Sequence, residues 1–219
     1  MPSKVYSAAV VGVEAFEVEI EVHAGWGNTD KIAVVGLPDP AVKESKDRVT
    51  SAISNSAFRW PYGKRITINL APADVRKEGP SFDLPIALGM LKLEENNRLP
   101  VLDAFCITGE LALSGQLSPV KGVLSIALEA KRRCRQTLIV PLENAAEAAV
   151  VEGVDVYGAS RFRRSCIFCA ATSPWSRSAQ STVGPPLDQP HRTLISARSE
   201  VSSMSNVPSK SPPRAGTTF

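Results

Sequence analysis

The chain has 219 residues, of which 43% are hydrophobic and 21% are charged, and its formal net charge is only +3. This length allows one good domain with an extension, or two small domains, and the apolar content is sufficient for a real core. The net charge gives no overall argument for nucleic-acid binding. It is unevenly placed, however, because residues 159–219 carry +6 and residues 1–158 carry −3.

The cysteines and the hydropathy pattern bear on the compartment. Cys106 lies in an apolar strand pattern and Cys134 late in a helical one, which is typical of reduced thiols in a cytoplasmic protein. No apolar run approaches the roughly 18–20 residues that a membrane span needs. The N-terminus shows no apolar segment followed by a cleavage site, so we expect no signal peptide and no membrane contact.

The first half of the chain begins with strand patterns. Residues 5–12 are β-rich, and residues 15–24 alternate between apolar and acidic side chains, which predicts a half-buried strand. Residues 25–28 indicate a turn, and residues 32–36 a short buried strand. Asp39 is placed to cap a helix over residues 41–56, with Pro40 at its first position.

The second half mixes strands and helices. We expect strands at residues 65–70, 104–108, 137–140 and 154–157, helices at 82–93, 122–134 and 143–150, and a hairpin at 110–116 around Ser114-Gly115. Strands that lead and then mix with helices predict an α+β fold, or α/β sandwich, in which helices pack mainly on one side of a mixed sheet.

Several motifs occur in a fixed order along residues 1–158. They are Val35-Gly36-Leu37-Pro38-Asp39, Glu44-Ser45-Lys46-Asp47-Arg48-Val49, Ile68-Asn69-Leu70-Ala71-Pro72-Ala73-Asp74, Lys77-Glu78-Gly79, Phe82-Asp83-Leu84-Pro85-Ile86-Ala87, Gly109-Glu110-Leu111, Pro119-Val120-Lys121-Gly122-Val123-Leu124 and Val140-Pro141 with Glu143-Asn144-Ala145-Ala146-Glu147-Ala148. This ordered set closely resembles the N-terminal domain of the magnesium-chelatase-related AAA+ ATPases of the YifB/ComM type.

The resemblance implies a fold of the ribosomal protein S5 domain 2 type, related to the C-terminal domain of Lon proteases. In the family this domain precedes an AAA+ motor, which binds ATP and Mg²⁺ and forms rings, and ComM-like members are implicated in DNA remodelling. No GxxxxGK[ST] phosphate loop occurs in the 219 residues. We therefore expect residues 1–158 to be a non-catalytic module without a cofactor. Its partner would be the motor of its own family.

The resemblance to Lon raises a second hypothesis, a serine peptidase that uses Ser81. Such a serine needs a neighbouring base. Alignment to the Lon pattern places Leu124 at the position of the Lon lysine, and Leu124 cannot accept a proton, while Lys121 falls one helical turn early. We therefore interpret Ser81 as a vestigial position and as the N-cap of the following helix, with Asp83 favourable near the same helix terminus.

Other candidate sites have structural interpretations. Gly25-Trp26-Gly27 lacks the longer loop and following helix of a phosphate site. We expect His23 and the acidic residues of the same strand to be solvent-exposed, and three acids near the Lys77 loop to form structural ion pairs. Four basic residues at the end of the helix 122–134 match the helix dipole, with nucleic-acid contact as the alternative. The acidic residues of that strand are Glu17, Glu19 and Glu21, and the three acids near the Lys77 loop are Asp74, Glu78 and Glu110. The four basic residues are Lys131, Arg132, Arg133 and Arg135.

Residues 159–219 form a distinct segment with 13 Ser, seven Arg and seven Pro. This composition predicts a disordered basic linker. Cys166 and Cys169 have metal-ligand spacing, but no second pair follows. A third interpretation is a frameshift near residues 158–161, since back-translation of residues 195–219 in a shifted frame permits a segment that resembles the family's approach to its phosphate loop. We then expect the tail to have no evolved function and the chain to stop short of the motor.

Overall fold

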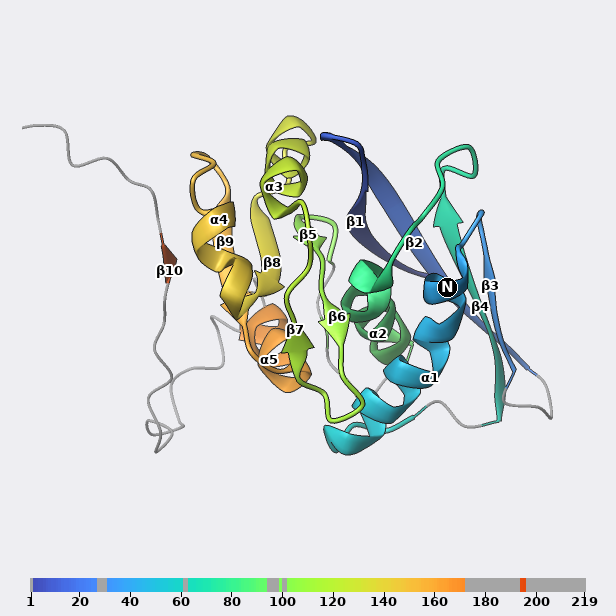
Figure 1. The fold of residues 1–219 in the computed structure, drawn as a ribbon. Coiled ribbons are helices and arrows are strands. Elements are labelled where there is room, and N and C mark those ends of the chain that lie inside the picture. Colours follow the sequence, from blue (N-terminus) through green and yellow to red (C-terminus); the bar gives the residue numbers. More distant parts are fainter. Residues whose placement is uncertain are drawn as a thin grey trace, which may run out of the picture.

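The computed structural model describes residues 2–26, 31–60, 63–93, 99, 102–171 and 194–195. One mixed sheet runs through it, in the order β10-β9-β8-β5-β1-β2-β4-β3 (Figure 1). Its strands are β1 (Ser3–Val11), β2 (Glu14–Trp26), β3 (Ile32–Val35), β4 (Lys64–Ala71), β5 (Phe105–Ile107), β8 (Thr137–Pro141), β9 (Asp155–Ala159) and β10 (Leu194–Ile195).

The sheet combines antiparallel and parallel pairs, and β9–β10 is one of the antiparallel ones. β1, β2 and β4 are antiparallel neighbours, whereas β1–β5, β5–β8, β8–β9 and β3–β4 are parallel pairs. β6 (Glu110–Leu111) and β7 (Leu117–Ser118) form a separate hairpin. The mixed sheet and the α+β fold class are as the sequence predicted.

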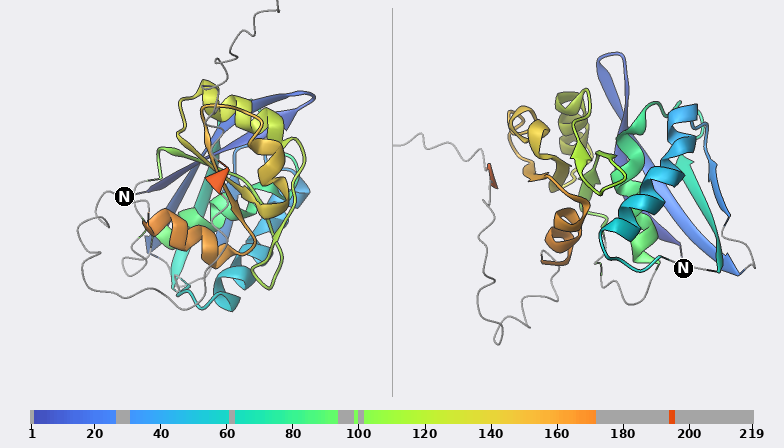
Figure 2. Two further views of the ribbon diagram at one scale, coloured as in Figure 1. Left: turned by 90° about the vertical axis from the view of Figure 1, so that its left-hand side faces the viewer. Right: turned by 60° about the horizontal axis from the view of Figure 1, so that its bottom comes forward.

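Five α-helices and two 3₁₀ turns occur in the described part of the chain: α1 (Pro40–Asn55), η1 (Pro80–Phe82), α2 (Asp83–Lys92), α3 (Val123–Arg132), η2 (Leu142–Asn144), α4 (Ala145–Ala148) and α5 (Phe162–Ala171). α1 and α2 lie side by side, in contact with each other (Figures 1 and 2). The sequence patterns located α1 to α4 to within a few residues of these bounds.

Helices cover both faces of the sheet. In β5, Phe105 and Ile107 belong to the core cluster that includes α1, α2 and α5 residues, whereas Cys106 belongs to a second cluster with α3 and α4. Because neighbouring residues of a strand point to opposite faces, the two clusters lie on opposite sides of the sheet. α1, α2 and α5 pack on one side, and the shorter pair α3 and α4 covers the other side around β5, β8 and β9, whose strands are apolar on both faces.

The segment after residue 159 also differs from expectation. The sequence predicted disorder there, but residues 162–171 form α5, in which Phe162, Cys166 and Cys169 are buried in the main core. The ring of Phe162 meets Phe58 edge to face at 5.6 Å, and Phe168 stacks on Tyr157 at 3.7 Å. The prediction of disorder was based on the composition averaged over residues 159–219, and this average did not indicate a short helix at its start. The rest of the tail lies outside the described residues, apart from β10.

No helix in the described part of the chain is long and apolar enough to cross a lipid bilayer.

Candidate functional site

Ser81 lies in the middle of η1, the 3₁₀ turn that leads into α2. The N-cap prediction for Ser81 is wrong, because the N-cap residues are Gly79 for η1 and Phe82 for α2, and neither helix start has a side-chain cap. An N-cap needs an extended backbone at the residue before the helix, and Ser81 is already inside the turn. Its carbonyl oxygen accepts hydrogen bonds from Gly109 N at 2.9 Å and Thr108 Oγ1 at 3.3 Å.

No base acts on Ser81 in the described part of the structure. Leu124 lies in α3 with 41% of its surface exposed, and its backbone N–H donates to Glu147 Oε1 at 3.1 Å. Lys121 is exposed in the turn before α3. Among the described side chains, none that can accept a proton forms a hydrogen bond with the Ser81 hydroxyl.

Two residues after Ser81, the carboxylate of Asp83 is fully buried at the start of α2. It accepts hydrogen bonds from Arg48 Nε at 2.6 Å and Nη2 at 3.0 Å, from the Ser45 hydroxyl, and from Leu111 N at 3.2 Å. Burial raises the pKa of Asp83, and the hydrogen bonds from Arg48 and Ser45 oppose this shift. These hydrogen bonds connect α1, α2 and β6. Each carboxylate oxygen of Asp83 accepts two of them, so the acceptor positions of Asp83 are occupied.

Asp39 joins the start of α1 to the loop before Ser81. Its Oδ1 accepts from Val42 N at 2.7 Å, which confirms the predicted N-cap, and its Oδ2 accepts from Gly79 N at 3.0 Å. Within the same loop Lys77 is fully buried, and its ammonium donates to the Pro72 carbonyl. Burial lowers the pKa of Lys77. The Lys77–Ser81 loop is thus held by side chains on both sides.

Replacement of Asp39 by Ala is expected to lower the free energy of unfolding by about 1–2 kcal/mol, because α1 loses its cap and Gly79 N loses its acceptor. Urea unfolding followed by circular dichroism measures this loss. Asp39→Asn keeps one acceptor oxygen for the cap and should cost less. Equal stability of the Ala variant and the parent chain would contradict the double role of this carboxylate.

Most of the other acidic and basic candidates form ion pairs. Glu78 pairs with Arg76 at the surface, whereas Asp74 and Glu110 form no ion pair within the described part of the chain. Glu17, Glu19 and Glu21 of β2 were expected to be solvated, but each of them has a partner. Glu17 pairs with Arg135 at 2.8 Å, Glu19 and Glu21 pair with Lys4, and Glu21 also accepts from Asn69. His23 is exposed, as predicted.

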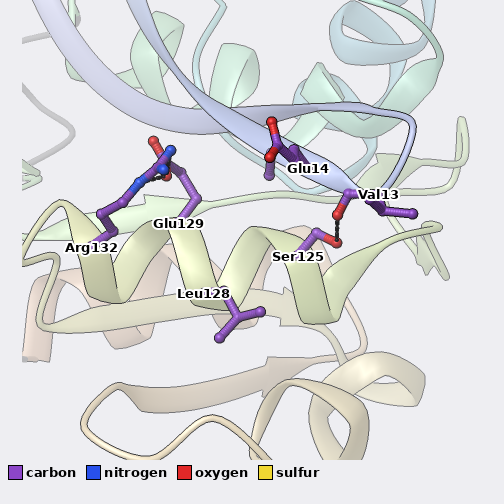
Figure 3. A pocket seen from close by; sticks show the side chains of 7 residues that line it. Val13, Glu14, Ser125, Leu128, Glu129 and Arg132 are labelled. Carbon is purple, nitrogen blue, oxygen red and sulfur yellow. Dashed lines mark hydrogen bonds and ion pairs between the residues drawn. The ribbon is translucent and has the colours of Figure 1, made fainter.

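Two carboxylates, Glu129 and Glu17, offset part of the charge of the predicted basic patch at the end of α3. Arg132 and Arg133 both pair with the buried carboxylate of Glu129, and the guanidinium of Arg135 lies 3.6 Å from the ring centre of Tyr6. A small hollow of about 180 Å³ lies between this helix and the β1–β2 turn (Figure 3). There Ser125 Oγ donates to the Val13 carbonyl at 2.8 Å, so its hydroxyl proton is already used.

No metal site was found within the described ranges, where no three His, Cys, Asp or Glu side chains gather suitably. Cys166 and Cys169 are buried in α5, and burial raises the pKa of both thiols, to about 12 for Cys169. Gly25 and Trp26 lie at the end of β2, and Gly27 lies outside the described residues.

Sequence reasoning missed the Asp83 cluster as a unit. Ser45, Arg48 and Asp83 are each part of an ordered motif, but nothing in the sequence says that residues 35 to 38 positions apart meet. Asn144 was missed in the same way, although its side-chain amide pairs with both the N–H and the carbonyl of Val120. A charged residue inside an otherwise apolar run, as at Asp83, is the signal that could have found the cluster.

Known proteins resemble this chain over the region that contains Ser81 and the Asp83 cluster. The family model described as subunit ChlI of Mg-chelatase matches residues 18–144. Uncharacterized protein YifB of Salmonella typhimurium is 44% identical over 164 residues, which are 75% of this chain and 32% of that protein. Competence protein ComM of Haemophilus influenzae is 47% identical over 153 residues, which are 70% of this chain and 30% of that protein.

A more distant similarity agrees with the fold. The Lon protease of Brevibacillus choshinensis is 27% identical over 139 residues, which are 61% of this chain and 17% of that protein. The chain spans about a third of the length of the YifB and ComM proteins that it matches. With the model match over more than half of its residues, the chain belongs to the magnesium-chelatase-related family that includes YifB and ComM.

Proposed function

We propose that the folded part of this chain is a non-catalytic module of a longer magnesium-chelatase-like protein. The observation that carries this proposal is the position of Ser81 and the lack of a base beside it among the described residues. Ser81 lies inside a 3₁₀ turn, and its hydroxyl forms no hydrogen bond with a proton acceptor among the described residues. Around it, Asp39, Lys77 and Asp83 are used to hold the loop, α1 and α2 in place.

The partner in this proposal is the AAA+ motor that family resemblance implies. YifB and ComM are about three times as long as the region shared with this chain. ATP and Mg²⁺ would be needed by that motor and not by the module. Remodelling of DNA is proposed only for the longer protein, on the basis of the resemblance to the competence protein.

The competing function is a Ser peptidase, which the similarity to Lon proteases motivates. It requires that Ser81 become nucleophilic without a base, and the residue at the base position, Leu124, has a hydrocarbon side chain. We expect the full chain to remain unlabelled by a fluorophosphonate probe under conditions that label a known serine peptidase completely. The Ser81→Ala variant should change the free energy of unfolding by less than about 0.5 kcal/mol.

Labelling of the parent chain that disappears in Ser81→Ala would overturn the non-catalytic proposal. Ser118→Ala is a suitable control, because Ser118 is also partly buried but lies in the β6–β7 hairpin. If labelling persisted in Ser81→Ala and disappeared in the control, a different serine would be reactive and the module would again not be inert.

A further inference from the structure

A groove lies between α1 and β3, at the end of the sheet. The cavity has a volume of about 600 Å³. One wall is the beginning of β3, with Ile32 and Ala33, and the other is the outer flank of α1, with Lys46, Thr50 and Ser54. This flank is the side of α1 away from α2, because Ser45 and Arg48 face Asp83 of α2.

β3 is the terminal strand of the sheet, and no described strand pairs with its second edge (Figure 1). Ile66 N donates to the Lys31 carbonyl at 2.9 Å, in register with the parallel β3–β4 pairing. Since hydrogen-bonding direction alternates along a strand, Ala33 and Val35 face β4, and Ile32 and Val34 direct their N–H and C=O groups to the free edge. An edge of this kind can accept another strand.

The groove is also positively charged. Lys31, Lys46 and Arg65 line it, against a single acidic side chain, Asp47. None of these three cations has an ion pair with another residue of the described ranges, whereas Lys4, Arg48 and Arg135 elsewhere are paired. Cations on α1, on β4 and just before β3, none with an ion pair in the described ranges, therefore line one cavity beside an open strand edge.

We propose that this groove binds an extended, acidic segment of a partner protein, which adds to β3 as a further strand. Main-chain hydrogen bonds to Ile32 and Val34 would align the segment, and its acidic side chains would meet Lys31, Lys46 and Arg65. A four-residue edge offers few main-chain bonds, so the charges are needed for affinity and choose acidic partners over basic ones. This binding does not depend on whether Ser81 is inert.

The probe is the peptide acetyl-EVEVEV-amide, titrated into the full chain, with acetyl-KVKVKV-amide as the charge-reversed control. Amide hydrogen exchange is followed residue by residue by NMR. The acidic peptide is expected to slow exchange at Ile32 and Val34 more than at Ala33 and Val35, which are already bonded to β4. A version with every backbone amide N-methylated should lose binding, because neither of its edges keeps an N–H group that can pair along β3.

Charge variants complete the test. Lys46→Glu and Arg65→Glu should each weaken the acidic peptide at least tenfold, while Lys131→Glu, an equal charge change on α3 outside the groove, should change affinity less than twofold. Equal loss in all three variants, or no protection at Ile32 and Val34, would overturn the proposal. If inorganic tripolyphosphate competes with the peptide and the N-methylated peptide binds as well as the parent, the groove is a simple anion site and strand addition is wrong.

Discussion

Replacement of Arg48 by Met is expected to lower the free energy of unfolding by about 3–5 kcal/mol at pH 7, because it leaves a buried carboxylate without its cation. The side chain of Asp83 is fully buried and that of Arg48 is 22% exposed, with their closest atoms 2.6 Å apart. Ser45 and Leu111 N would still donate to Asp83, but they carry no charge. Urea unfolding measures the loss.

This loss should depend on pH. Burial already raises the pKa of Asp83 in the folded state, and removal of Arg48 raises it further. A carboxyl group whose folded pKa exceeds its unfolded value binds protons more strongly when folded, so its contribution to stability falls as pH rises through that interval. The deficit of Arg48→Met relative to the parent chain should therefore shrink between pH 7 and pH 5.

Arg76→Met is the matched control, since Arg76 pairs with Glu78 at an exposed position and such pairs contribute less than about 1 kcal/mol. A deficit in Arg48→Met that matched this control, or that stayed constant with pH, would show that Asp83 is not held as an ionised buried partner.

Replacement of Gly36 by Ala is expected to cost about 4 kcal/mol or more. Gly36 has φ +97°, and a Cβ there would collide with the Leu70 carbonyl oxygen and lie 2.9 Å from its carbonyl carbon. These atoms belong to the backbone of β4, which is itself paired on its other side with β2, so they have little freedom to move. Steric overlap therefore adds to the strain of the unfavourable backbone angle.

Gly12→Ala separates these two contributions. Gly12 also has positive φ, +65°, but no atom lies within 4 Å of the position of its added Cβ. It should cost only about 1–2 kcal/mol, the strain of the left-handed backbone alone. Thermal and urea unfolding of both variants give the comparison, and a difference between them of less than about 1 kcal/mol would refute close packing of β3 against Leu70.

Local patterns explain why most elements could be predicted from the sequence. The alternation in residues 15–24 depends only on neighbouring residues, and it corresponds to β2. The cap at Asp39 is likewise local, since it involves Val42 three residues later. The order of strands and helices gave the α+β class, and the family motifs added the more specific fold type, which no local pattern would have distinguished from other mixtures of strands and helices.

The errors concern contacts between distant segments. Ser81 was assigned as a cap because it precedes an apolar helix, but it lies inside the 3₁₀ turn. The N–H group of Gly79, just before that turn, donates instead to Asp39, 40 residues earlier. The acids of β2 were assigned to solvent, although Glu17 meets Arg135 across 118 residues. The groove beside β3 was not foreseen, because an unpaired edge is a property of the whole sheet and of no single strand.

The position of α5 sets a practical limit for work on the isolated domain. A recombinant fragment that stopped at residue 158, where the family resemblance suggested an end, would remove the side chains of Phe162, Cys166 and Cys169 that close the core beside Phe58. Such a fragment would expose part of its apolar core to solvent, and exposed apolar surface promotes association between copies of a protein. Self-association of that shortened protein would then reflect the choice of cutting point and not a native assembly.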